Sequence, residues 1–205
     1  MTVQTKVAVV YYSATGHVHA LAEAVRDGAE KAGAEVRLRR VAELAPAEVV
    51  ASKPEWAAHA EATRDVPLAS LDDLVWADAV VLGTPTRFGQ MASQLKQFID
   101  TAGGLWAQGK LADKVYAAFT STGTGGGSET TIVGLNNIFT HWSGIIVPPG
   151  YSDPIVFQHG NPYGVSHTDG NGAYPVGDTK LAGAAHIGSR VTEVATLLKR
   201  GRAAA

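Results

Sequence analysis

A stretch of six residues, Ser13-Ala14-Thr15-Gly16-His17-Val18, follows an apolar run and leads into a helical pattern. Its two hydroxyl groups stand beside the first turn of a helix, where free N–H groups and the positive end of the helix dipole favour an anion. The stretch contains no lysine or arginine. A triphosphate usually needs a lysine and a metal ion, whereas hydroxyls and amides suffice for a single phosphomonoester. The pattern therefore predicts a site for the phosphate of a mononucleotide.

Two further polar stretches also follow apolar runs. The first includes Thr86, Arg87 and Phe88, and the second is the glycine-rich run Ser121, Thr122, Gly123, Thr124, Gly125, Gly126. In an open α/β sheet, ligands bind beyond the carboxyl ends of the strands, where the strand order reverses. Each stretch alone is also compatible with an ordinary turn. Because all three follow expected strands, together they favour one shared ligand site.

The elements that must position these stretches alternate between strands and helices. Continuous β-branched and aromatic runs predict strands buried on both faces, as in parallel sheets, and apolar stripes at helical spacing predict the helices. The expected strands span 6–12, 34–41, 78–83, 114–119 and 145–147, and the expected helices span 18–31, 91–99, 128–141 and 181–200. This alternation predicts an α/β fold with a mostly parallel, five-stranded sheet covered by helices. Proline- and glycine-rich segments at about 45–70 and 149–178 are expected to be long loops.

Composition excludes several classes of protein. The chain has 205 residues, 45% hydrophobic and 18% charged, with no cysteine and a formal net charge of −2. Such an apolar content excludes general disorder, and the missing cysteines exclude disulfides, thiolate metal sites and a cysteine nucleophile. No apolar stretch is long enough for a membrane span, and the small net charge gives no reason to expect nucleic acid as a partner. We expect a single cytoplasmic domain over residues 1–205.

Other nucleotide and hydrolase motifs are weak in this chain. Residues 104–111 imitate a P-loop, but Leu111 replaces the required serine or threonine and the segment follows a helix. A dinucleotide-binding glycine motif and a nucleophile elbow are both missing. The histidines show no metal-ligand spacing, so no metal site is expected.

At its polar stretches the chain resembles the WrbA family of flavodoxin-like NAD(P)H:quinone oxidoreductases. The similar motifs are Tyr-Tyr-Ser-x-x-Gly-His at 11–17, Gly-Thr-Pro-Thr-Arg-Phe-Gly at 83–89, Gly-Gly-Leu-Trp at 103–106 and Ser-Thr-Gly-Thr-Gly-Gly-Gly at 121–127. The resemblance implies a doubly wound sheet with strand order 2-1-3-4-5, bound FMN, NAD(P)H as co-substrate and quinones as substrates. It also implies a homotetramer or homodimer with active sites at subunit contacts.

The resemblance further assigns roles to residues of this chain. Ser13, Ala14, Thr15, Gly16, His17 and Val18 would hold the FMN phosphate. Thr86, Arg87 and Phe88 would meet the isoalloxazine ring, and residues 121–126 would surround its pyrimidine end and the ribityl chain. His141 would lie near the ring, and Trp106 would line the substrate side.

This chain departs from the family pattern at two positions. Thr15 stands where the family often has an aromatic residue that contacts the nicotinamide nucleotide, which leaves the choice between NADH and NADPH open. Trp142 follows His141 where the family often has a second histidine, and we expect it to pack in a subunit contact rather than to bind quinone.

The predicted function is transfer of two electrons from NAD(P)H to quinones in a ping-pong cycle, with the flavin carrying the redox chemistry. A one-electron carrier of the flavodoxin type would use the same fold, but such carriers are commonly strongly acidic, and this chain has a net charge of −2. A scaffold or interaction protein that kept the fold without the flavin is the other alternative.

Overall fold

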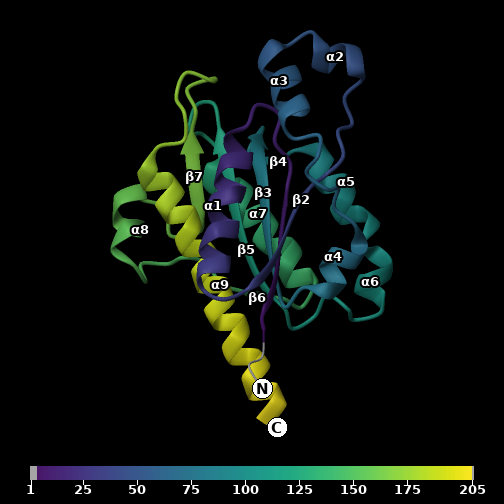
Figure 1. Ribbon diagram of the computed structural model, residues 1–205, viewed down its shortest axis with the longest axis vertical. Coiled ribbons are helices and arrows are strands. Elements are labelled where there is room, and N and C mark those ends of the chain that lie inside the picture. The colour runs from purple at the N-terminus through teal and green to yellow at the C-terminus, as the bar shows by residue number, and fades with distance from the viewer. Residues whose placement is uncertain (1–3, 205) are drawn as a thin grey trace.

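The computed structural model describes residues 4–204 and has a parallel sheet at its centre (Figure 1). The five parallel strands lie in the order β2-β1-β3-β5-β6, which confirms the predicted flavodoxin-like order 2-1-3-4-5. Their bounds are β1 (Lys6–Tyr11), β2 (Glu35–Arg40), β3 (Ala79–Arg87), β5 (Val115–Thr122) and β6 (Ile145–Ile146).

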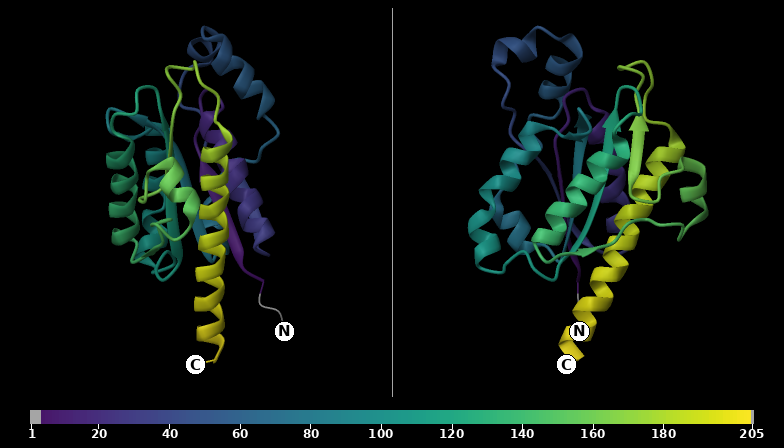
Figure 2. Two further views of the ribbon diagram at one scale, coloured as in Figure 1. Left: turned by 90° about the vertical axis from the view of Figure 1, so that its left-hand side faces the viewer. Right: turned by 180° about the vertical axis from the view of Figure 1, so that it is seen from behind.

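Helices cover both faces of this sheet (Figure 2). One face carries α1 (His17–Lys31) and α9 (Asp178–Ala204), and the other carries α4 (Leu71–Trp76), α5 (Ser93–Thr101) and α7 (Ser128–His141). Strand β1 shows why both layers are needed, because Val7 and Val9 face the first layer while Ala8 and Val10 face the second, all fully buried. Burial of both faces accounts for the continuous apolar runs of the sequence.

The segment 45–70 is not the long loop that its prolines suggested. It contains α2 (Ala47–Ala51) and α3 (Pro54–Ala62). Pro54 lies in the first turn of α3, where a proline is favoured because the missing N–H has no partner in the helix. The loop prediction for this segment was therefore wrong.

The segment 149–178 is also partly regular. It contains α8 (Pro154–His159) and strand β7 (Val165–Thr168), and Asp153 caps α8 by accepting a hydrogen bond from the Ile155 N–H at 2.8 Å. Strand β7 pairs with Phe119–Thr122 of β5, whereas β6 pairs with Val115 and Tyr116. Two separate pieces of chain therefore lie along the same side of β5, and only the first was predicted as a strand.

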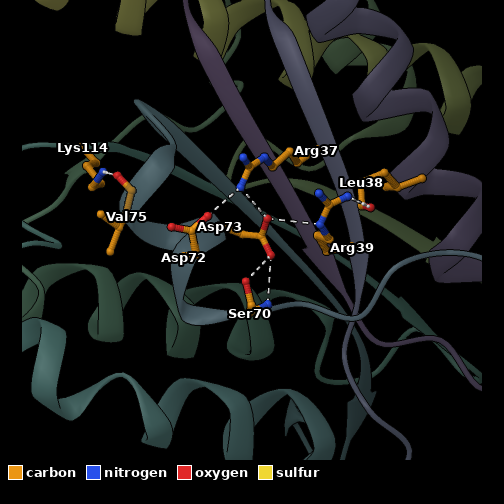
Figure 3. A network of polar contacts seen from close by, with 8 residues as sticks. All are labelled: Arg37, Leu38, Arg39, Ser70, Asp72, Asp73, Val75 and Lys114. Carbon is orange, nitrogen blue, oxygen red and sulfur yellow. Dashed lines mark hydrogen bonds and ion pairs between the residues drawn. The ribbon is translucent and has the colours of Figure 1, made fainter.

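A buried carboxylate attaches α4 to the neighbouring strand β2 (Figure 3). Asp73 is 2% exposed and accepts hydrogen bonds from Arg37 and Arg39, each at 3.1 Å, and from the N–H and hydroxyl of Ser70. Burial by itself would raise the pKa of Asp73, but the Ser70 and arginine donors outweigh it and hold the pKa below its ordinary value. The carboxylate therefore stays ionised and holds two cations at the edge of the sheet.

Candidate functional site

The three polar stretches meet at the carboxyl ends of the parallel strands. Tyr11, at the end of β1, pairs with Gly83, and Pro85 of β3 pairs with Ser121 of β5. The same edge includes the end of β7, where Thr168 pairs with Thr122. This edge lies at the top of Figure 1. The structure therefore brings together the stretches at 13–18, 84–89 and 121–127.

The first loop ends at the N-terminus of helix α1. Gly16 caps α1 with a left-handed backbone (φ 98°), and its N–H donates to the Ser13 hydroxyl at 3.1 Å. The first turn of α1 contains no acidic side chain, so the positive end of the helix dipole and its free N–H groups are available to an anion. Ala14 and Val18 are buried and Thr15 is exposed.

His17 of this loop, which the sequence assigned to the site, lies among three further histidines that the sequence did not assign to it. The His17 ring stacks on His167 at a centroid distance of 5.4 Å, and His17 Nδ1 lies 3.6 Å from a carboxylate oxygen of Asp169. On the other side, His19 bonds the Tyr11 hydroxyl at 2.6 Å, and its ring lies 5.5 Å from that of His59.

Most of these imidazoles are neutral at pH 7. Burial, followed by the nearby charges of His19, His17 and Arg40, lowers the pKa of His59 to about 4. Burial is also the main cause that lowers the pKa of His19 and of His167. Three neutral imidazoles therefore lie around the loop, together with the side chain of Asp169 beside His17. His59 comes from α3 and His167 from the end of β7, and no local sequence pattern reveals that these elements lie beside the loop.

The second and third loops touch each other through two glycines. A β-carbon at Gly127 would lie only 2.8 Å from the Cα of Gly89. Hydroxyl groups of the first turn of α7, which follows the third loop, also bond the second loop. Thr131 donates to the Thr86 hydroxyl at 3.1 Å and Thr130 donates to the Gly89 carbonyl at 3.0 Å. The spacing between the loops is therefore set by backbone contact.

Phe88 projects from the second loop into solvent. Its backbone is left-handed (φ 50°) and its side chain is fully exposed. A bulky residue seldom adopts this conformation, and such strain is concentrated at functional sites. Arg87 beside it is also exposed.

A buried hydroxyl and a close contact mark the third loop. Ser121 is 2% exposed, and its hydroxyl has no hydrogen-bond partner within residues 4–204. Gly123 lies so close to Asn171 that a β-carbon there would be 2.3 Å from the amide oxygen. Asn171 therefore packs directly on the backbone at Gly123, and the loop keeps one polar group unpaired.

Trp106 and His141 lie together but not beside the loops. Trp106, in α6 (Gly103–Ala107), donates its indole N–H to the His141 carbonyl at 2.8 Å. His141 ends α7, whose 14 residues begin at Ser128 beside the third loop, and a helix of that length spans about 20 Å. Within one chain, the pair is therefore at the opposite end of α7 from the other predicted site residues.

Trp142 packs inside its own chain, not in the subunit contact that we expected from the sequence. It is 7% exposed, and its ring lies 5.7 Å from that of Tyr116 and 6.3 Å from that of Phe139.

Comparison with known proteins identifies the family. Residues 5–155 match the family described as NADPH-dependent FMN reductase. The chain belongs to the NADPH-dependent FMN reductase family. Membership confirms the expected assignment to the flavin-dependent oxidoreductases, with FMN as cofactor and NAD(P)H as electron donor.

Individual relatives of this FMN reductase family member are similar over most of their length. A Deinococcus radiodurans protein named NAD(P)H dehydrogenase (quinone) is 48% identical, covering 82% of this chain and 85% of that protein. A protein of the same name from Rhodopseudomonas palustris (strain TIE-1) is 44% identical, covering 94% and 98%. A WrbA-like flavodoxin from Agrobacterium tumefaciens superposes with a TM-score of 0.68 at 27% identity, covering 94% and 98%. These likenesses confirm the resemblance to the WrbA family.

The loops of this family member fit FMN. The N-terminus of α1, which has no acidic side chain in its first turn, suits a phosphate together with the Ser13 hydroxyl. The unpaired Ser121 hydroxyl offers a hydrogen bond to a polar ligand atom. At Gly126 an added β-carbon would meet only Thr124, at 3.8 Å, so the backbone there is accessible to a ligand. In the described residues, no helix is long and apolar enough to cross a membrane, and no group of three or more His, Asp or Glu side chains could hold a metal ion.

Proposed function

We propose that this chain is an FMN-dependent NAD(P)H:quinone oxidoreductase, built as a single flavodoxin-like domain over residues 1–205. The main support is that three loops meet at one edge of the sheet. One of them leads into the N-terminus of α1, which suits a phosphate, and the other two are in backbone contact with each other. The relatives that share 44–48% identity bear the name of this activity. The bound flavin supplies hydride transfer in both half-reactions.

We assign the residues of the three loops to binding and orientation. Residues 13–18 hold the phosphate, Thr86, Arg87 and Phe88 contact the ring, and residues 121–126 contact its pyrimidine edge and the ribityl chain. The glycines let backbone N–H groups approach that edge, where they stabilise the negative charge that develops on reduction. Arg87 also stabilises this negative charge, because it is exposed at the loop and forms no ion pair within residues 4–204. Donor and acceptor then use one open face in turn, which gives ping-pong kinetics.

Trp106 and His141 complete the site from a neighbouring subunit in this proposal. Their own chain keeps them about the length of α7 away from the loops, yet Trp106 is 56% exposed and is positioned by its bond to His141. An exposed, oriented aromatic residue is suited to contact a planar quinone. We therefore propose a homotetramer or homodimer in which His141 lies near the ring and Trp106 lines the substrate side of the partner's site.

A visible spectrum and a turnover assay test the proposal. The purified protein is titrated with FMN, and oxidation of NADH and of NADPH is then followed with and without a small benzoquinone. We expect a flavin spectrum and turnover that depends on the quinone. A protein that stays colourless with FMN supports a flavin-free scaffold, and a flavoprotein without quinone-dependent turnover refutes the enzymatic assignment.

A further inference from the structure

A groove of about 640 Å³ lies between α3 and α5, beside the loop of Arg87 and Phe88. In Figure 1 and in the right view of Figure 2, α3 projects beyond the sheet edge on the side of α5. The walls of the groove include Tyr12, Trp56, Arg87, Phe88, Gln94 and Lys96. The groove therefore combines aromatic rings with two cations and adjoins the proposed flavin site.

One carboxylate holds the aromatic wall of this groove in place. Glu43 accepts hydrogen bonds from the Trp56 indole N–H at 3.2 Å, the Tyr12 hydroxyl at 2.8 Å and the Gln94 amide at 2.7 Å. Helices α2 and α3 contain no fully buried residue. Trp56 is half-buried and packs against the core of the second face, and this polar network orients its indole and joins α3 to the loop after β1 and to α5.

Glu43 is suited to that role because it stays ionised. Burial would raise its pKa, but the Ala45 N–H and the donors from Gln94, Tyr12 and Leu44 outweigh burial and keep the pKa below its ordinary value. An ionised carboxylate only accepts hydrogen bonds, so it orients the indole N–H toward itself. The Trp56 ring is therefore held in one orientation at the groove wall.

The charged residues of the groove suit phosphate groups. Arg87 is exposed and donates to the carbonyl of Thr86 at 3.2 Å. Lys96 is 49% exposed and pairs with Asp100, itself 62% exposed, at 2.6 Å. An exposed ion pair of this kind contributes little free energy, so Lys96 can turn to another anion. A rigid aromatic plane beside cations is the combination that binds a base and its phosphates.

We propose that this groove binds the adenosine diphosphate part of the NAD(P)H donor, with the purine on the Trp56 ring and the phosphates between Arg87 and Lys96. The inference rests on the proposed function, because it places the remote end of the donor next to the flavin loops. Trp56 is then a binding residue, and Glu43 is the positioning residue that keeps its ring in the groove.

The test measures binding without turnover. ADP is titrated into the FMN-loaded protein in a calorimeter, for the wild type and for Trp56→Leu, Trp56→Phe and Lys96→Gln. We expect Trp56→Leu to weaken ADP binding about tenfold, since stacking contributes on the order of a tenfold factor or more, and Trp56→Phe to retain most of the affinity. Lys96→Gln is expected to weaken binding and to reduce its dependence on salt.

Matched controls separate stacking and charge from general damage. Lys53→Gln removes an exposed cation just before α3, outside the groove lining, and should leave ADP affinity unchanged. Nicotinamide mononucleotide lacks the purine, so its affinity should not respond to Trp56→Leu. In turnover, Trp56→Leu should raise the KM for NADH while the KM for benzoquinone and the FMN affinity stay constant.

Three results would overturn the inference: a wild type that does not bind ADP, a Trp56→Leu protein that binds ADP as tightly as the wild type, or a Lys53→Gln loss equal to that of Lys96→Gln. If Trp56→Leu fails to fold, judged by circular dichroism, Lys96→Gln and its salt dependence decide. Failure of the proposed function would be recognised separately. The wild type would then show no quinone-dependent turnover, whereas its ADP binding can still be measured by calorimetry.

Discussion

Replacing Gly127 with alanine should separate the two loops that we assign to the flavin ring. Gly127 has φ +81°, and an added β-carbon would lie 2.8 Å from the Cα of Gly89. A left-handed backbone costs a residue with a side chain about 1–2 kcal/mol, and overpacking costs about 1–3 kcal/mol more. Because the contacted Cα of Gly89 is a backbone atom, it cannot move aside as a flexible side chain would, and one of the two loops must shift. We therefore expect Gly127→Ala to lower the free energy of unfolding by about 2–5 kcal/mol.

Gly33 provides the matched control for this substitution. It has φ +92°, but a β-carbon there would meet nothing within 4 Å, so Gly33→Ala carries only the backbone cost of about 1–2 kcal/mol. Urea denaturation measures the stability of both variants, and quenching of flavin fluorescence measures their FMN affinity. Gly127→Ala should bind FMN at least about tenfold more weakly, a loss of about 1.4 kcal/mol, while Gly33→Ala binds it normally. Equal stability and equal FMN affinity in the two variants would refute the loop-spacing argument.

Three further predictions concern pH, the buried ion pairs and subunit assembly. The pKa of His59 is about 4 in the folded chain against 6.5 ordinarily, so the unfolded chain takes up the proton first as pH falls. As the pH falls from 6.5 to about 4, the free energy of unfolding should therefore drop by at most about 3 kcal/mol. Urea denaturation of His59→Asn at several pH values should show a smaller drop. The same dependence of stability on pH in the variant and the wild type would contradict a lowered pKa of His59. Asp73→Asn should lower the free energy of unfolding by about 3 kcal/mol because it breaks a buried ion pair. Asp72, whose side chain is 76% exposed, is the control, and Asp72→Asn should lower it by less than about 1 kcal/mol. Similar urea denaturation midpoints for the two variants would be incompatible with a stabilising role of the Asp73 network. Finally, mixing Trp106→Leu and Gly127→Ala subunits after unfolding should restore quinone turnover above that of either variant alone, and no gain would exclude a site shared between subunits.

Local patterns in the sequence were sufficient to predict the sheet and the place of its ligand edge. Apolar runs revealed the five strands, and helix α7 spans the expected residues 128–141. The meeting of the loops follows from parallel topology, because strands that run in one direction end at one edge. A helix N-terminus without acidic side chains could likewise be recognised from a few consecutive residues.

Tertiary structure decided everything that depends on residues far apart in the chain. Prolines at 54 and 154 looked like loop markers but begin helices, and α3 is attached to the rest of the fold through contacts with residues distant in sequence, such as the bond from Trp56 to Glu43. The same reason explains why His59 and His167 beside the first loop were missed. Periodicity records which side of an element is buried, but not which distant element covers it, because that choice is made by packing across the whole fold.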